Sequence, residues 1–326
     1  STGMIPEKIF VIPRSIENDV VLDTWFVSNG VPRNAGGYGS YNPSWDLLAA
    51  YLCTDGLPID ESDLFDPQQP FKNRDPRCTA TIVEFGTAHC GFIYDPSPAA
   101  TQVMNLTTGK MQTNNDSRIN AQYASFNGLV WKKGIDDSWL TNFPKVENDY
   151  IIMRYADVLL MYAEAKIEMN EIDDSVLEAI NTVRARAYGV SASAFLSHPA
   201  AVEARDQATL RRTVRLERRV ELAMENLRLQ DLMRWRLADK ALNSYNYIYL
   251  YPAQDCKTAL VDKGLWPWPA KPEIDEDGLA DFSPWVEKGW VMYGAKRNFP
   301  ERQYLWPIPT HEIELCPNLL PDNPGY

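Results

Sequence analysis

The spacing of hydrophobic residues changes near residue 150. From there to Gly189 no Pro or Gly interrupts the chain, and apolar residues recur every three or four positions. This spacing is typical of amphipathic helices. It predicts a helix of four to five turns that starts near residue 150 and buries Ile151, Tyr155, Leu159, Tyr162, Ala163 and Ile167.

A second helix is predicted after a short break at residues 170–173. Asp173 or Asp174 is a suitable N-cap, and Gly189 is a suitable terminator. Its apolar face carries Val176, Ile180, Val183 and Ala187. The two helices are expected to form an antiparallel hairpin, followed by a third helix over residues 207–225 and a fourth that runs to about residue 242 with a bend near Asn226.

The first 149 residues have a different pattern. Gly and Pro dipeptides recur at short intervals, which favours loops and short strands over long helices. Within this segment, residues 79–85 are the best strand candidate, and residues 43–52 predict a short helix capped by Ser44. We therefore expect a loop-rich part at residues 1–149 and a helical part at residues 150–326, together forming one structural domain.

The region after Asn243 loses the helical period and becomes rich in aromatic residues. We expect a long irregular region there, followed by a short helix at residues 310–315. The apolar residues of the final segment predict that it lies across the body of the protein.

Charge and hydropathy exclude several classes of protein. The 326 residues include 32 Lys and Arg against 44 Asp and Glu, a formal net charge of −12 that disfavours nucleic acid and anionic lipid as partners. No apolar run approaches the roughly 20 residues that a membrane-spanning helix needs. The first ten residues show no secretory signal pattern.

Motifs for cofactor, metal and catalytic chemistry are missing from the sequence. Five dispersed cysteines and three histidines, without a C-x-x-C, do not predict a metal site, and we interpret the cysteines as buried apolar groups. No nucleophile elbow, zinc-protease motif or phosphate-binding loop is present. A glycosidase, which needs only two carboxylates, stays open as an alternative. The acidic turn at residues 275–278 is interpreted as solvated.

The arginines of residues 211–236 are interleaved with acidic residues. Arg218 and Glu221, Glu225 and Arg228, and Asp231 and Arg234 each stand three positions apart, which is a spacing that allows contact on one helix face. We interpret this stretch as structural ion pairing between packed helices. Aromatic residues at helical spacing, including Tyr155, Tyr162 and Trp235, are interpreted as core.

Aromatic residues in predicted loops are the candidates for a binding surface, because loops lie at the surface. Trp and Tyr rings can stack on the C–H faces of sugars while neighbouring Asn and Asp side chains bind hydroxyl groups. Satellite core packing is the equally weighted alternative. The loop aromatics in question are Trp25, Tyr38, Tyr41, Trp131, Trp139, Trp266, Trp268 and Trp285.

Several ordered sequence blocks carry a family resemblance. They are RYADVLLMYAEA at 154–165, INTVRARA at 180–187, ERRVELA at 217–223 with DLMRW at 231–235, DG at 55–56 with KNRDPR at 72–77, and YLWPIP at 304–309 with PNL at 317–319 and NPGY at 323–326. In these blocks the chain resembles the SusD/RagB family of outer-membrane nutrient-binding lipoproteins.

The resemblance implies a fold and a function. The implied fold is mainly α, a superhelix of tetratricopeptide-like helical hairpins with long irregular loops and a few short strands. The implied function is non-catalytic capture of a glycan, or of peptides in the RagB branch, and its delivery to a SusC-like TonB-dependent barrel, with no cofactor. The location implied is the cell surface, through a lipid anchor absent from this chain. We expect the chain to match the middle and C-terminal part of the family, with the first helical repeats missing.

For a glycan-binding function, the aromatic residues that stack on the sugar are expected in the Gly- and Pro-rich segments outside the family blocks. We predict that Trp25, Tyr38, Tyr41, Trp131 and Trp139 stack on the ligand, with Asn34 and Asn42 at the rim. The alternative is a peptide ligand, which acidic loops such as residues 275–277 would favour if it were basic.

Overall fold

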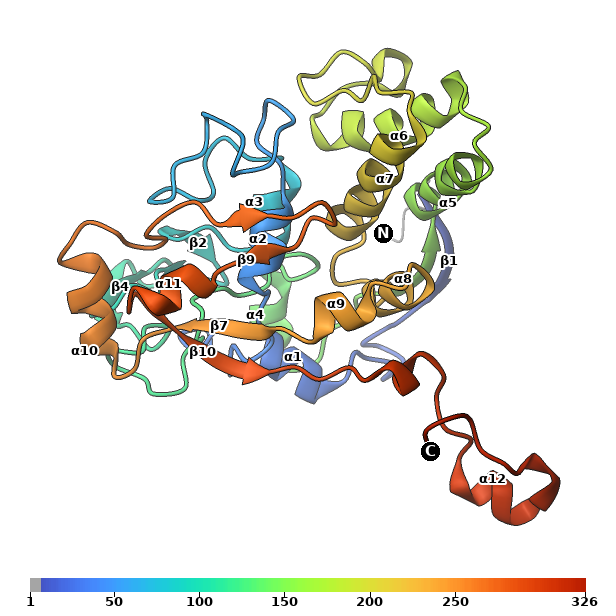
Figure 1. Cartoon of the computed structure of the whole chain (residues 1–326). Coiled ribbons are helices and arrows are strands. Elements are labelled where there is room, and N and C mark those ends of the chain that lie inside the picture. Colours follow the sequence, from blue (N-terminus) through green and yellow to red (C-terminus); the bar gives the residue numbers. More distant parts are fainter. Residues whose placement is uncertain (1–6) are drawn as a thin grey trace.

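The computed structural model describes residues 7–326, in which short helices and strands are joined by long loops (Figure 1). The α-helices are α1 (Thr24–Gly30), α2 (Trp45–Ala50), α3 (Arg77–Thr81), α4 (Ser138–Asn142), α5 (Tyr155–Glu168), α6 (Asp174–Ala187), α7 (Gln207–Glu221), α8 (Arg228–Arg234), α9 (Ala238–Leu242), α10 (Ala253–Cys256), α11 (Ser283–Glu287) and α12 (Thr310–Leu315). The 3-10 turns are η1 (Ala192–Ala194), η3 (Glu301–Tyr304) and η4 (Pro317–Leu319), and η2 (Lys257–Val261) is a π-helical turn.

Every strand of residues 7–326 pairs with antiparallel neighbours. Those of the largest sheet, in the order β2-β3-β4-β5, are β2 (Thr87–His89), β3 (Phe92–Tyr94), β4 (Gln102–Asn105) and β5 (Lys110–Thr113). The other strands of residues 7–326 form three sheets of two strands each. They are β1 (Lys8–Ile12) with β6 (Tyr150–Arg154), β7 (Tyr245–Tyr249) with β10 (Val291–Lys296), and β8 (Glu273–Ile274) with β9 (Ala280–Asp281). The mainly helical character with few short strands agrees with the prediction.

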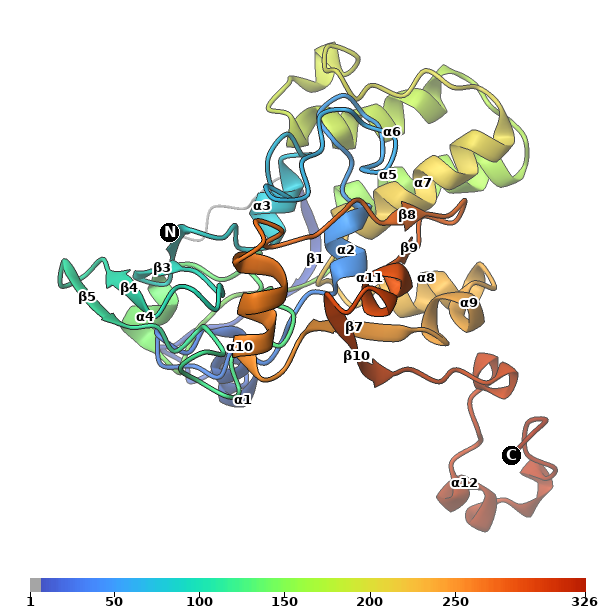
Figure 2. The ribbon, with the colours of Figure 1, turned by 60° about the vertical axis from the view of Figure 1, so that its left-hand side comes forward.

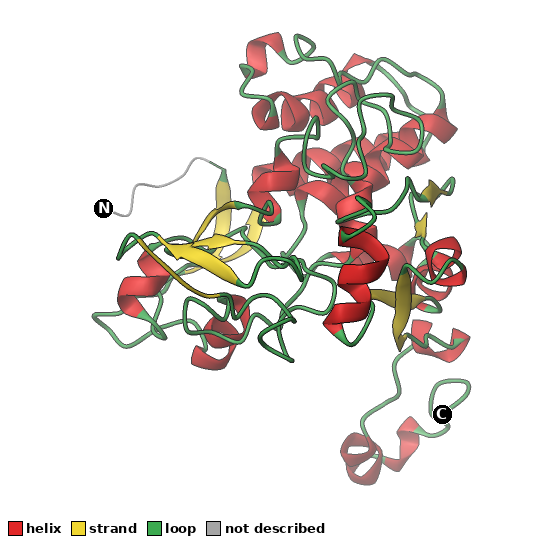
Figure 3. Ribbon diagram, turned by 90° about the vertical axis from the view of Figure 1, so that its left-hand side faces the viewer, coloured by secondary structure: helices red, strands yellow, loops and turns green. Residues whose placement is uncertain are grey.

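Helices α5, α6 and α7 pack together at one end of the molecule (Figure 2). Their buried side chains include Leu160, Ile167, Val176, Ile180 and Val214. The predicted hairpin of α5 and α6 is confirmed, and Asp173 caps α6 by accepting a hydrogen bond from the Ser175 N–H. Figure 3 shows that loops make up much of the rest of the chain.

The start of the first helix and part of its buried face were predicted wrongly, while Ala163 and Ile167 are buried as predicted. Residues 150–154 form β6, because Ile151 pairs with Val11 of β1 and the backbone is extended there. Helix α5 begins at Tyr155, and this residue and Tyr162 are exposed rather than core. Trp235 is half-buried, with its indole N–H donating to Glu164.

The third predicted helix is shorter than expected. Helix α7 ends at Glu221, and Met224 and Asn226 both have positive φ angles, which helical backbone does not tolerate. The break near Asn226 is therefore confirmed, while the predicted continuous helix to residue 242 is two short helices, α8 and α9.

Residues 79–85 do not form the predicted strand. Residues 77–81 are helix α3, because Asp75 accepts from the Arg77 N–H and its carbonyl accepts from the Cys78 N–H. Only Ile82 keeps a strand-like bridge, to Trp131. The short helix α2 is confirmed, with the Ser44 hydroxyl accepting from the Leu47 N–H.

The main hydrophobic core joins the two halves of the chain. Trp45 of α2 lies among Trp268, Phe282 and Trp285, with ring centroids between 5.7 and 6.4 Å from its own. Trp268 and Trp285 are thus core residues, as the alternative of satellite packing predicted. The region after Asn243 is also more ordered than expected, because β7 and β10 pair across it.

The interleaved charges form ion pairs, but mostly between elements. Arg218 of α7 binds Asp157 of α5 at 2.8 Å and Asp231 of α8 at 2.9 Å. Of the three intrahelical pairs suggested by spacing, Asp231 with Arg234 is present. Arg218, Asp157 and Asp231 are buried where these helices meet, so each needs a partner of opposite charge.

The C-terminal segment does not lie across the body. Residues 305–326, with α12, project away from it in all three views (Figures 1 to 3). The segment closes on itself instead, since Arg302 donates to the Gly325 carbonyl and Asn323 donates to the Trp306 carbonyl. Trp306 and Leu315 are each 69% exposed. Cys316 is exposed as well, unlike the buried Cys53, Cys78, Cys90 and Cys256.

Across residues 7–326, no helix combines the length and the apolar character that crossing a membrane requires.

Candidate functional site

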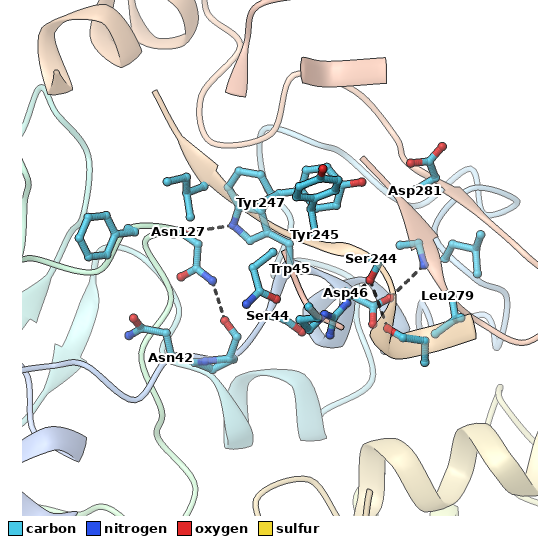
Figure 4. A pocket seen from close by; sticks show the side chains of 18 of the residues that line it. Asn42, Ser44, Trp45, Asp46, Asn127, Ser244, Tyr245, Tyr247, Leu279 and Asp281 are labelled. Carbon is cyan, nitrogen blue, oxygen red and sulfur yellow. Dashed lines mark hydrogen bonds between the residues drawn. The ribbon is translucent and has the colours of Figure 1, made fainter. Parts of the chain in front are cut away.

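A cavity of about 590 Å³ lies between α2, strands β7 to β9 and the loop at residues 126–127 (Figure 4). We call it the tyrosine pocket, because Tyr245 and Tyr247 of β7 line it. These two residues are two positions apart and therefore lie on the same face of the strand. Other residues that line it are Asn42, Asp46, Phe126, Asn127, Asp281 and Arg297.

The tyrosine rings of the pocket form a cluster with a third ring. The centroid of Tyr293, on the paired strand β10, is 4.3 Å from that of Tyr245 and 5.8 Å from that of Tyr247. Burial raises the pKa of Tyr247 to about 12, so its hydroxyl stays protonated at neutral pH. The β7–β10 pairing thus fixes apolar ring surface together with hydroxyl groups that can hydrogen-bond.

The opposite wall is held by buried polar contacts. Asp46 of α2 accepts from Arg219 and from the Ala280 N–H, and Asn127 donates to the Pro43 carbonyl. The Trp45 indole N–H donates to the Asn127 carbonyl at 2.8 Å. These groups already hydrogen-bond within the protein, and their contacts set the shape of the wall.

Other polar groups of the pocket are available to bind a ligand. The hydroxyls of Tyr245 and Tyr247 and the exposed Asn246 side chain have no hydrogen-bond partner within the described part of the chain. A cavity with aromatic surface and unpaired hydroxyl and amide groups can bind a small polar molecule that has apolar faces.

A second aromatic surface lies beside α1. We call it the aromatic edge and define it as Trp25, Phe26, Tyr38 and Tyr41. The Trp25 and Tyr38 rings lie 5.7 Å apart, those of Phe26 and Tyr41 lie 5.3 Å apart, and Trp25 is 64% exposed. The predicted exposure of Trp25, Tyr38 and Tyr41 is therefore confirmed.

A glycine-dependent turn presents Tyr38. A Cβ atom on Gly37 would lie 2.1 Å from the Val31 carbonyl oxygen, so only glycine fits at this position. The Tyr38 N–H donates to Ser28 and the Gly39 N–H donates to Val31, which fixes the turn against α1. Residues 38–42 then run from the aromatic edge to the tyrosine pocket, where Ser40 and Asn42 line the wall.

The remaining sequence-predicted site residues have structural contacts. Trp139 is only 2% exposed and its indole N–H donates to Asn148, so it cannot be a stacking platform. Its side chain packs from helix α4 into a core cluster. Trp131 is half-buried against the same cluster. Asn34 binds the loop at residues 114–115, and the Asn42 amide donates to Gly39 and Leu129.

Tyr245 and Tyr247 were not predicted from the sequence as site residues. Their signal was the alternation Tyr245-Asn246-Tyr247-Ile248-Tyr249, which has the period of a strand and places tyrosines on one face. This strand pairs with residues 291–296, which are distant from it in sequence. The alternation alone therefore did not indicate which segment it pairs with.

Comparison with known proteins gives consistent matches. The family model described as the SusD family matches residues 6–326. SusD-like protein P2 of Formosa agariphila is 28% identical over 207 residues, which cover 63% of this chain and 30% of that protein.

Solved structures agree with this match. A SusD-like carbohydrate-binding protein from Bacteroides fragilis has a TM-score of 0.68 at 28% identity, covering 96% of this chain and 54% of its own. A second SusD-like protein from B. fragilis has a TM-score of 0.63 at 20% identity, covering 98% and 54%, and shows likeness of fold alone. The chain thus spans about half the length of these solved structures, and its matched part covers less than a third of the Formosa protein.

Proposed function

Because this chain belongs to the SusD family, we propose that it captures an oligosaccharide or polysaccharide and does not change it chemically. The observation that carries the proposal is the tyrosine pocket, in which ring surface and unpaired hydrogen-bonding groups face one cavity of about 590 Å³. A similar solved protein is described as carbohydrate binding, which supports the same ligand class.

In this proposal, a sugar ring packs its C–H face against Tyr245 or Tyr247 while its hydroxyls bind Asn246 and the tyrosine hydroxyls. Residues 38–42 connect the pocket with the aromatic edge, so a longer glycan continues over Tyr41 and Trp25. The tyrosines contribute contact area with few rotatable bonds, which keeps the entropic cost of binding low.

The location of the protein, its partner and its wider architecture are proposed from its membership of the SusD family. The protein is held at the cell surface by a lipid anchor and passes its glycan to a SusC-like TonB-dependent barrel in the outer membrane. Helices α5 to α7 contribute to a tetratricopeptide-like superhelix, and residues 1–149 and 150–326 belong to one structural domain.

The test is titration calorimetry with a panel of glycans and short peptides, combined with product analysis after long incubation. A glycan should bind in the micromolar to millimolar range, about −8 to −4 kcal/mol, without products. Tyr247→Ala should weaken binding by about 1–3 kcal/mol, which is five- to 150-fold. The Tyr162→Ala variant is the matched control, since Tyr162 is exposed on α5 and outside the pocket.

The outcomes separate the alternatives. Unchanged affinity in both Tyr245→Ala and Tyr247→Ala, with loss in Trp25→Ala, would move the site to the aromatic edge. Salt-sensitive binding of peptides alone would replace the glycan by a peptide ligand. Release of shorter sugars would contradict the non-catalytic proposal.

A further inference from the structure

Arg297 is a cation in the tyrosine pocket that makes no ion pair with the described residues. Its side chain lines the cavity, and its guanidinium donates to the Ser244 hydroxyl. Its Nε is buried and has no hydrogen-bond partner, and the side chain makes no ion pair with any carboxylate of residues 7–326. A half-buried guanidinium left in this state is unfavourable, because burial removes its hydration without supplying a counter-charge.

Two further arginines increase the positive charge behind the pocket. Arg219 binds Asp46, and Arg228 is half-buried with no ion pair in the described chain. Asp46 attracts both Arg228 and Arg297, while Arg219 repels both of them. Burial, with Arg219 as a second cause, lowers the pKa of Arg228 to about 9. Asp46 is therefore shared by three guanidinium groups, of which Arg219 alone forms an ion pair with it, and Asp231 also attracts Arg228.

Apart from Asp46, the acidic residues of the pocket lie at its exposed rim. Asp281 is exposed and accepts from the Ser283 N–H, Asp275 is exposed and pairs with Lys240, and Glu273 is exposed. Carboxylates at an exposed rim accept hydrogen bonds from sugar hydroxyls, whereas the buried guanidinium wall favours an anion. The pocket is thus suited to a ligand that carries both hydroxyl groups and a negative charge.

We propose that the glycan bound in the tyrosine pocket is acidic, with a carboxylate or sulfate group placed against Arg297. This inference rests on the proposed glycan-binding function and narrows its ligand class. The anion accepts hydrogen bonds from the part of the Arg297 guanidinium that lines the cavity, while hydroxyls of the same sugar bind at the acidic rim. Arg219 and Arg228 strengthen the attraction without contacting the ligand.

The experiment uses pairs of probes that differ only in charge. Tetrasaccharides of galacturonate, glucuronate, mannuronate and guluronate are titrated beside their methyl esters, and sulfated oligosaccharides beside their desulfated forms, at two salt concentrations. At least one acidic probe should bind tenfold or more tightly than its neutral counterpart, and the difference should shrink with salt. Preference among the uronates or among the sulfated probes identifies the anion.

Variants then assign the charge effect to one residue. Arg297→Gln should abolish the preference for the acidic probe while neutral binding persists, and Arg297→Lys should keep part of it, because the charge remains but the planar fork is lost. Arg205→Gln removes an exposed arginine paired with Asp174 and should change nothing. Thermal unfolding of each variant establishes that it is folded.

Two results would overturn the inference in different ways. Equal binding of acidic and neutral probes, unaffected by Arg297→Gln, would reject the acidic ligand and leave the glycan-binding function in place. Absence of binding to every glycan, acidic or neutral, would reject the function together with the inference.

Discussion

At the scale of single residues, Glu221 shows how this protein buries charge. Burial alone would raise the pKa of its carboxyl, but Arg77, Arg154 and Arg186 outweigh burial and hold the pKa at about 2. Arg154 donates to it at 2.6 Å and Arg77 at 3.0 Å. A buried carboxylate with three cationic partners stays ionised in the folded state at every ordinary pH.

Acid should therefore weaken the fold. The carboxyl has an ordinary pKa of 4.5 when unfolded, so its contribution to the free energy of unfolding is complete above about pH 4.5 and is lost as pH falls towards 2. Denaturant unfolding at pH 7, 5, 4 and 3 should show this decline. The Glu221→Gln variant should decline less steeply, and an identical slope in both proteins would show that Glu221 is not a source of the effect.

At the scale of elements, capping residues close in sequence predicted the ends of some helices, and pairing with distant segments determined the ends of others. Asp173 and Gly189 mark α6 because capping depends on the nearest residues. The start of α5 could not be predicted, because β1, more than a hundred residues earlier, holds residues 150–154 in a strand. In the site, the predicted exposure of Trp25 is right, although the residue lies in the short helix α1 and not in the predicted loop. The role of Tyr247 depended on β10 and the burial of Trp139 on α4.

The hairpin of α5 and α6 should be sensitive to loss of buried volume. Ile180 of α6 is fully buried in the cluster with Leu160 and Val214, so Ile180→Ala should lower the free energy of unfolding by about 2–5 kcal/mol. Glu178→Ala is the control, because Glu178 lies on the exposed face of the same helix. Denaturant titration of the two variants measures the difference, and equal losses would contradict the packing described for α6.

At the scale of the whole molecule, the body and the C-terminal segment are unequal contributors to stability. The last firm contacts with the body are Phe299, which is 7% exposed, and Tyr304, whose hydroxyl donates to Asp239 at 2.6 Å. Beyond them, residues 305–326 contact mainly one another. The segment thus adds exposed apolar surface without adding to the core.

Removing residues 305–326 should leave the thermal midpoint within a few degrees of that of the full chain. Removing residues 299–326 should lower it clearly, because the loss of Phe299 opens the small core around Leu232 and Ala238 and truncating a buried Phe costs about 3–5 kcal/mol. Calorimetry of both deletions provides the comparison. A large loss in the shorter deletion would show that the projecting segment stabilises the body.

The charge cluster around Glu221 also bears on the order of folding. It joins residues that are far apart along the chain: Arg154 is 67 positions from Glu221, Arg77 is 144 positions from it, and Glu7 is 147 positions from Arg154. Each contact closes a long loop whose entropic cost must be met before the charges can pair. We therefore expect the α5–α6 hairpin, made of neighbouring segments, to form early. The cluster is expected to assemble late and mainly to slow unfolding.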